Sequence, residues 1–212
     1  MFGTHDLLLF VLSGLLLNVT PGPDTALIVA RSTQMGVRGG FAACAGMSAG
    51  ILAHITAAAI GLSAIIAASA TAFGVIKFVG AGYLIYIGLR MMLAGRTTAP
   101  ADAAQLPTTT LPLRAVFWQG FFSNALNPKV AIFFLAFLPQ FVNADAPSKA
   151  LAFFFLGLVF NVNGTIWGLI VAYATARAAS ALRGAQRFQR WIDGAIGAMF
   201  VALGVKLALY QR

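Results

Sequence analysis

Charged residues are scarce in this chain of 212 residues, since Asp, Glu, Lys and Arg together make up 9% of it and only five are acidic. A soluble domain carries about a quarter charged residues, so the chain lacks the polar surface that water would require. Hydrophobic residues make up 60% of the sequence, and the mean hydropathy is +0.88. The composition therefore predicts an integral membrane protein.

Cysteine and histidine are also rare, and their scarcity excludes several kinds of site. Cys44 is the single cysteine, and His5 and His54 are the two histidines. One cysteine excludes an intramolecular disulfide and a cysteine metal cluster. No HExxH motif, Ser/His pair or paired-acid arrangement is present, which argues against an intramembrane enzyme. We expect no metal site and no cofactor.

The 14 Lys and Arg residues outnumber the acids, a balance that is found in nucleic-acid-binding proteins. Here the basic residues are spread over short loops instead of being clustered beside aromatic residues, so we expect no nucleic-acid partner. No Lys or Arg precedes the first apolar run, and a cleaved signal peptide needs such a basic start. The first apolar run is expected to remain in the membrane.

The long apolar runs predict six membrane-spanning helices. A spanning helix needs about 20 apolar residues, and the runs that supply them are residues 7–30, 41–65, 72–93, 115–144, 150–176 and 191–210. The sequence thus predicts an all-α membrane protein that lies in the lipid bilayer.

The basic loops predict how these helices are oriented, because Lys and Arg are enriched in cytoplasmic loops. One side would carry nine basic residues, Arg31, Arg38, Arg90, Arg96, Arg114, Arg177, Arg183, Arg187 and Arg190. The other side would carry four, Lys77, Lys149, Lys206 and Arg212. We therefore expect both termini outside the cell. Residues 95–113 would form a cytoplasmic linker between two three-helix units, residues 1–94 and 114–212.

The two units share a weak sequence repeat. Residues of the first unit match residues of the second in the same order: Gly14 and Asn18 with Gly120 and Asn124, then Gly50, His54 and Gly61 with Gly157, Asn161 and Gly168. Because each unit has an odd number of spans, the second would enter the membrane from the opposite face. That is an inverted repeat, an architecture typical of secondary transporters.

Proline-containing interruptions occur in the helix that leads each unit. Span 1 contains Asn18-Val-Thr-Pro-Gly-Pro-Asp24, and span 4 contains Asn124-Ala-Leu-Asn-Pro-Lys129. Proline removes a backbone donor and clashes with the preceding turn, so both helices should break near the midplane. The freed backbone groups must face protein or a water-filled cavity. Paired breaks of this kind indicate a substrate site, here with the candidate residues Asn18, Thr20, Pro21, Gly22, Pro23, Asp24, Thr25, Asn124, Asn127, Pro128 and Lys129.

Asp24 and Lys129 are charged residues deep within spans, and a charge in hydrocarbon costs at least a few kcal/mol. We expect Asp24 to bind an ammonium group. Lys129 and the start of the half-helix at Thr25 would bind a carboxylate. Together they suit a zwitterion with an uncharged side chain. A purely structural Asp24–Lys129 pair that holds the two halves together is the alternative.

Two residues are candidates for proton coupling. His54 lies within span 2, and histidine changes its charge near physiological pH. Asp24 is the other candidate, and the sequence does not choose between them. The counterpart of His54 in the second unit is Asn161, close to Asn163, which predicts a polar seam between spans 2 and 5. The stripes Gly46–Gly50 and Gly164–Gly168 are predicted to be helix-packing faces.

At several of these motifs the sequence resembles the LysE/RhtB family of amino-acid exporters. The resemblance is carried by Pro21-Gly-Pro23, by the run Gly80-Ala-Gly-Tyr-Leu-Ile-Tyr-Ile-Gly88, and by Asn127-Pro-Lys129. It implies proton-driven efflux of amino acids from the bacterial cytoplasm and a location in the cytoplasmic (inner) membrane. It does not fix the substrate, so export of a basic amino acid or a metal cation stays the alternative. Whether the unit is a monomer or a homodimer is left open.

Overall fold

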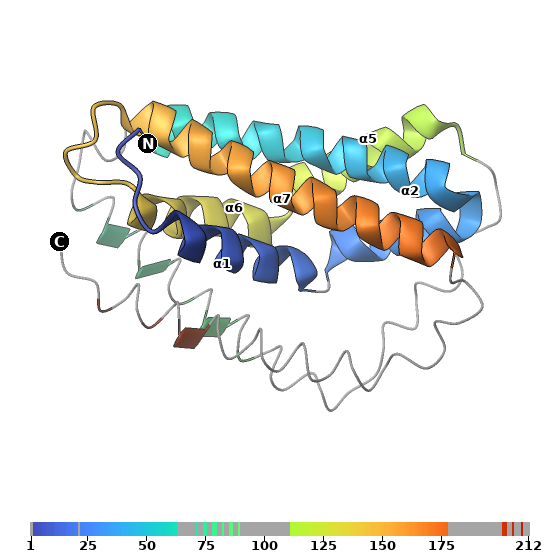
Figure 1. The fold of residues 1–212 in the computed structure, drawn as a ribbon, viewed down its shortest axis with the longest axis horizontal. Helices are drawn as coiled ribbons and strands as arrows, with labels where there is room; N and C mark the ends of the chain where they lie inside the picture. Colours follow the sequence, from blue (N-terminus) through green and yellow to red (C-terminus); the bar gives the residue numbers. More distant parts are fainter. Residues whose placement is uncertain are drawn as a thin grey trace.

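The computed structural model describes residues 2–20, 22–62 and 111–177, with scattered positions in 71–89 and 201–209. The elements named in these ranges are all helical: α1 (Leu7–Val19), α2 (Pro23–Ala57), η1 (Ala58–Leu62), α5 (Leu113–Ala125), α6 (Pro128–Ala136), η3 (Leu138–Phe141) and α7 (Lys149–Arg177) (Figure 1). Two of these helices are long and apolar enough to cross a membrane, and the bent pair of α5 with α6 and η3 gives a third candidate span. Pro21 and most of predicted spans 3 and 6 and of the linker lie outside the described residues.

The predicted break in span 1 is confirmed. Helix α1 ends at Val19, and the Thr20 hydroxyl donates to the carbonyl of Leu16 at 2.8 Å. Gly22 is fully extended, and α2 begins at Pro23. Proline is favoured at the first helical position, since its missing N–H would have no partner there. The two segments of span 1 are therefore separate helices.

The connection between spans 1 and 2 is shorter than predicted, because α2 consists of two helices that meet at a kink at Gly36 and together cover residues 31–40. The reversal is confined to Gly36, whose φ of 66° and ψ of −161° lie in a region that glycine adopts most readily. After this residue the helix runs back alongside α5 and α7 (Figure 1). The chain thus reverses at one glycine, where the sequence predicts a ten-residue loop.

The predicted break in span 4 is also confirmed. Helix α5 ends at Ala125, α6 begins at Pro128, and the two parts of the span are bent by 47°. The Asn127 side chain accepts a hydrogen bond from the backbone N–H of Lys129 at 3.0 Å, as an N-cap does. Both second segments therefore begin with a proline that is followed by a charged residue, Asp24 or Lys129.

Close helix packing surrounds these breaks. A Cβ atom added to Gly50 would lie 2.8 Å from the carbonyl oxygen of Phe121, and one added to Gly46 would overlap the carbonyl of Phe117. The Gly46–Gly50 stripe therefore packs α2 against the backbone of α5, as predicted. A separate core between α1, α6 and α7 is filled by phenylalanines. Phe10, Phe133, Phe137 and Phe153 are each at most 1% exposed there.

The N-terminal segment is tied to the loop after η3. The backbone N–H of His5 donates to the carbonyl of Phe141 at 3.0 Å, and Thr4 pairs with Val142. These residues lie at one end of the molecule. The bend of α2, the start of α5 and the end of α7 lie at the other (Figure 1). The second end carries Arg38, Arg114 and Arg177.

Candidate functional site

Asp24 lies at the second residue of α2, where its carboxylate meets the end of α5. It accepts hydrogen bonds from Ser123 Oγ at 2.7 Å, Asn124 Nδ2 at 2.8 Å and Asn127 Nδ2 at 3.2 Å. The position in the first turn of a helix favours a negative charge. The break of the first unit is thereby joined to the break of the second by three neutral donors.

Lys129 makes the reciprocal connection from the second unit to the first. Its ammonium donates to the carbonyl oxygens of Leu17 at 3.1 Å and Thr20 at 3.3 Å, at the end of α1. Carbonyl groups at the end of a helix lack intrahelical partners, and a cation is favoured there. Lys129 therefore acts as a cap for the broken end of α1.

Asp24 and Lys129 do not form a salt bridge; in the described part of the chain the single acid–base contact is between His5 and Asp6. A direct Asp24–Lys129 ion pair is therefore absent from the described residues, while a structural role of the two residues in holding the halves together stays a prediction. The two charges are held near the same junction, but each is satisfied by neutral groups of the opposite unit. The two halves are connected by these crossed hydrogen bonds.

His54 reaches the site indirectly. Its Nε2 atom lies 3.0 Å from the carbonyl oxygen of Asn124, and its ring packs against Phe134 with centroids 5.9 Å apart. A carbonyl oxygen can only accept, so Nε2 must carry the proton. His54 thus supports the residue whose side chain binds Asp24.

The two asparagines predicted to form a seam point to different helices. Asn161 of α7 accepts a hydrogen bond from Ser48 Oγ of α2 at 3.0 Å. Asn163 instead donates to the carbonyl of Val11 in α1 at 3.0 Å. The seam between spans 2 and 5 therefore contains Asn161 but not Asn163.

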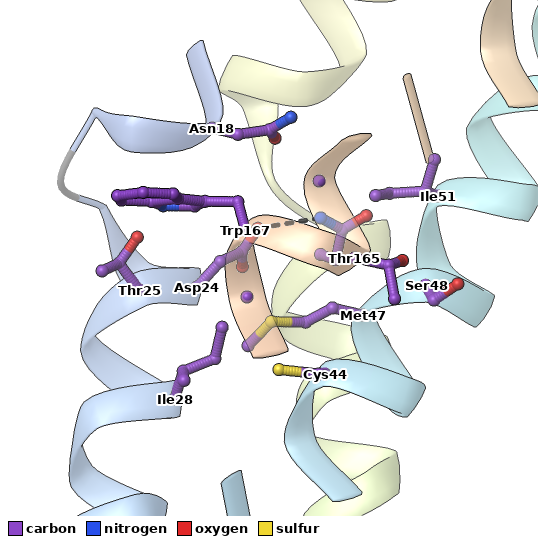
Figure 2. Close-up of a pocket in the computed structure, with 13 residues that line it drawn as sticks. Asn18, Asp24, Thr25, Ile28, Cys44, Met47, Ser48, Ile51, Thr165 and Trp167 are labelled. Atoms are coloured by element: carbon purple, nitrogen blue, oxygen red, sulfur yellow. Dashed lines mark hydrogen bonds between the residues drawn. The ribbon is translucent and has the colours of Figure 1, made fainter. Parts of the chain in front are cut away.

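A cavity of about 60 Å³ lies beside Asp24, between α1, α2, α5 and α7. Figure 2 shows Asp24 between Ile28, Cys44 and Met47 below it and Asn18 above it, with Thr25 at the left edge. One water needs about 10–15 Å³ of such space, so the cavity admits several waters.

Only part of the predicted site borders this cavity. Asn18, Asp24, Thr25 and Asn124 line it. Thr20, Gly22, Pro23, Asn127, Pro128 and Lys129 lie at the breaks but not on its wall. The sequence missed the remaining lining residues, which are Ile28, Cys44, Met47, Ser48, Ile51, Gly164, Thr165, Trp167 and Gly168.

The Gly164–Gly168 stripe is a packing face, as predicted, and it also borders the cavity, which the sequence did not predict. A Cβ atom on Gly168 would lie 3.1 Å from Cys44 Sγ and 3.3 Å from Ile28 Cδ1. One on Gly164 would lie 3.1 Å from the amide of Asn18. The two glycines therefore let α7 approach α1 and α2 closely at the cavity wall. Their spacing alone was the available signal, and it is shared with ordinary packing stripes.

The described residues contain no group of three or more His, Cys, Asp or Glu side chains placed to hold a metal ion. The polar groups around the cavity are one carboxylate, one thiol, several amides and hydroxyls, and an indole N–H. Such a set offers hydrogen bonds and a single negative charge to a bound molecule.

Comparisons with known proteins show the family to which this chain belongs. The chain is 28% identical over 207 residues to an uncharacterized membrane protein of Pseudomonas aeruginosa, which covers 97% of this chain and 96% of that one. It is 24% identical over 210 residues to a leucine efflux protein of Salmonella typhimurium, and this match covers 99% of this chain and 98% of that protein. No solved structure matches the chain. Residues 15–211 match the LysE type translocator family. The chain therefore belongs to the LysE type translocators, which are membrane transporters and not enzymes, and which export amino acids or other small solutes.

Proposed function

We propose that this protein is a secondary transporter that exports neutral amino acids from the bacterial cytoplasm in exchange for protons. The observation that carries the proposal is the position of Asp24, a carboxylate that borders a cavity between two broken helices. Broken helices around a midplane site are typical of such transporters. The substrate-binding residues would be those of the two breaks together with the cavity wall.

The charge of the cavity supports a zwitterionic substrate. Asp24 is the one charged side chain among the residues that line it, so it suits a single ammonium group. A basic amino acid would bring a second cation without a second acid to meet it. A metal cation, the other alternative, prefers several anionic, thiolate or imidazole ligands, whereas this wall offers Asp24 and Cys44.

The apolar part of the wall supports an uncharged side chain. Ile28, Met47 and Ile51 border the cavity and are each at most 6% exposed. One relative is named as a leucine efflux protein, and an aliphatic side chain would suit these neighbours. We therefore place apolar amino acids first in the order of expected substrates.

Proton coupling is assigned to Asp24 in this proposal, with His54 as the alternative carrier. A carboxylate that binds either a proton or an ammonium group, but not both, exchanges the two across the membrane. Asp24 borders the cavity, whereas His54 is hydrogen-bonded to the backbone of Asn124 behind it. Direct competition at one carboxylate requires no further relay.

The proposal places the protein in the inner membrane, as two inverted three-helix units in the lipid bilayer. The contact between Thr4 and Val142 supports a common side for the N-terminus and the loop before α7. Arg38, Arg114 and Arg177 lie toward the opposite end, which the positive-inside rule assigns to the cytoplasm. Whether one chain or a homodimer is the working unit does not affect the site.

A substrate panel in proteoliposomes tests this function. The purified protein is reconstituted, a pH gradient is imposed, and uptake is measured for neutral, basic and acidic amino acids and for divalent metal ions. We expect gradient-dependent transport of neutral amino acids, strongest for apolar ones. Transport of metal ions or basic amino acids in preference to neutral ones would contradict the proposal.

A further inference from the structure

Several buried polar atoms in the described residues have no hydrogen-bond partner, and three of them belong to residues that line the cavity. These three are Asn18 Nδ2, Trp167 Nε1 and Asn124 Oδ1. Leaving a buried donor or acceptor unsatisfied costs about 1–3 kcal/mol. Three such atoms around one cavity are therefore an unusual concentration, and a bound polar molecule would satisfy them together.

The chemistry of these atoms is complementary to the two ends of an amino acid. The indole N–H of Trp167 and the amide N–H of Asn18 are donors, and a tryptophan can only donate. Asn124 Oδ1 is an acceptor on the side chain whose Nδ2 donates to Asp24. Two free donors suit a carboxylate, and an acceptor beside a carboxylate suits an ammonium group.

The two donors come from α1 and α7, which are in contact with each other. The amide of Asn18 lies against Gly164, where a Cβ atom would be 3.1 Å from it. Trp167 follows three residues later, on the same side of the helix. Figure 2 shows the Trp167 indole between Asn18 and Thr25, with Asp24 next to it.

The sequence predicted that Lys129 binds the substrate carboxylate. In the structure its ammonium donates instead to the carbonyls of Leu17 and Thr20, and Lys129 does not line the cavity. We propose that Trp167 Nε1 and Asn18 Nδ2 bind the substrate carboxylate, while Asp24 and Asn124 Oδ1 bind its ammonium. This assignment rests on the proposed function, because it presumes an amino-acid substrate. Neutral donors on the carboxylate leave Asp24 and the ammonium as the charged pair, which suits a neutral zwitterion.

The test compares an amino acid with the amine that lacks its carboxylate. The dissociation constants of L-leucine and 3-methylbutylamine are measured on the detergent-purified full chain. The variant Trp167→Phe retains a ring but loses the N–H. Asn18→Leu removes the second donor at similar size. Trp118→Phe is the matched control, since Trp118 lies on the outer face of α5 and is 43% exposed.

We expect Trp167→Phe and Asn18→Leu each to weaken leucine binding by about 10-fold to 100-fold, the effect of a hydrogen bond to a charged group. Binding of the amine should stay within about twofold. Unchanged leucine binding in both variants, or equal losses for leucine and the amine, would overturn the carboxylate subsite while the transporter function stands. Wild-type protein that binds no amino acid would contradict the function itself, and the subsite with it.

Discussion

Asn124 donates from Nδ2 to Asp24 Oδ2 at 2.8 Å, which joins the residue just before the second helix break to the acid just after the first. Lys129 returns the connection by donating to the carbonyl of Leu17. Each break is therefore held by groups of the other. In the proposed function, movement of α1 and α2 against α5 and α6 would change these contacts.

Lys129→Met should lower stability and transport together. The substitution leaves the carbonyls of Leu17 and Thr20 without their donor, which costs about 1–3 kcal/mol per buried group. We expect a lower unfolding temperature in detergent and reduced leucine transport. Lys149→Met is the matched control, because Lys149 donates to a loop carbonyl, that of Ala144.

The double variant Asp24→Lys with Lys129→Asp tests whether the two residues act as an ion pair. If the two residues acted as an ion pair, exchanging them would restore function. Since each is bound to neutral groups of the opposite unit, we expect the double variant to be as inactive as the single ones. Recovery of transport would show that the charges pair with one another.

Gly168→Ala should reduce transport without unfolding the protein. The added methyl group would lie 3.1 Å from Cys44 Sγ and would narrow a cavity of about 60 Å³. We expect leucine transport to fall only about tenfold, because a hydrophobic site discriminates weakly per methylene. Alanine transport should fall less, because its shorter side chain needs less of the narrowed space. Gly61→Ala is the control, since a Cβ atom there meets nothing within 4 Å. Equal leucine transport by both variants would show that the cavity is not on the path.

His54→Gln should retain proton-driven transport. Glutamine can still donate to the carbonyl of Asn124 but cannot change its charge. If Asp24 carries the proton, the variant still accumulates substrate when a pH gradient is imposed. Leucine exchange that persists without any response to the gradient would instead assign the proton to His54.

Labelling of single cysteines should establish the orientation of the chain. Asp145 and Arg38 are exposed residues at opposite ends of the described structure. In intact cells a membrane-impermeant maleimide should react with Asp145→Cys but not with Arg38→Cys, because the basic end faces the cytoplasm. The wild-type chain is the control, since Cys44 is 3% exposed. The reverse pattern of labelling would invert the topology.

The breaks in spans 1 and 4 were predictable because proline disrupts helical hydrogen bonding by local chemistry alone. The importance of Asp24 followed from the cost of a charge among apolar residues. The partners of Asp24 and Lys129 were not predictable, because they depend on how two distant segments meet in space. Trp167 was missed for a related reason. A tryptophan in an apolar helix gives no sign that its N–H lacks a partner until the cavity is known.

Leucine counterflow in proteoliposomes, compared between wild-type protein and Asp24→Asn, tests the central claim most directly. Asparagine at this position can still accept from Ser123 or Asn127, so the variant should fold, but it lacks the charge that holds an ammonium group. We predict exchange by the wild type and by Asp145→Asn, and a loss on the order of a hundredfold in Asp24→Asn. Counterflow by folded Asp24→Asn at the wild-type rate would contradict a site built around this carboxylate.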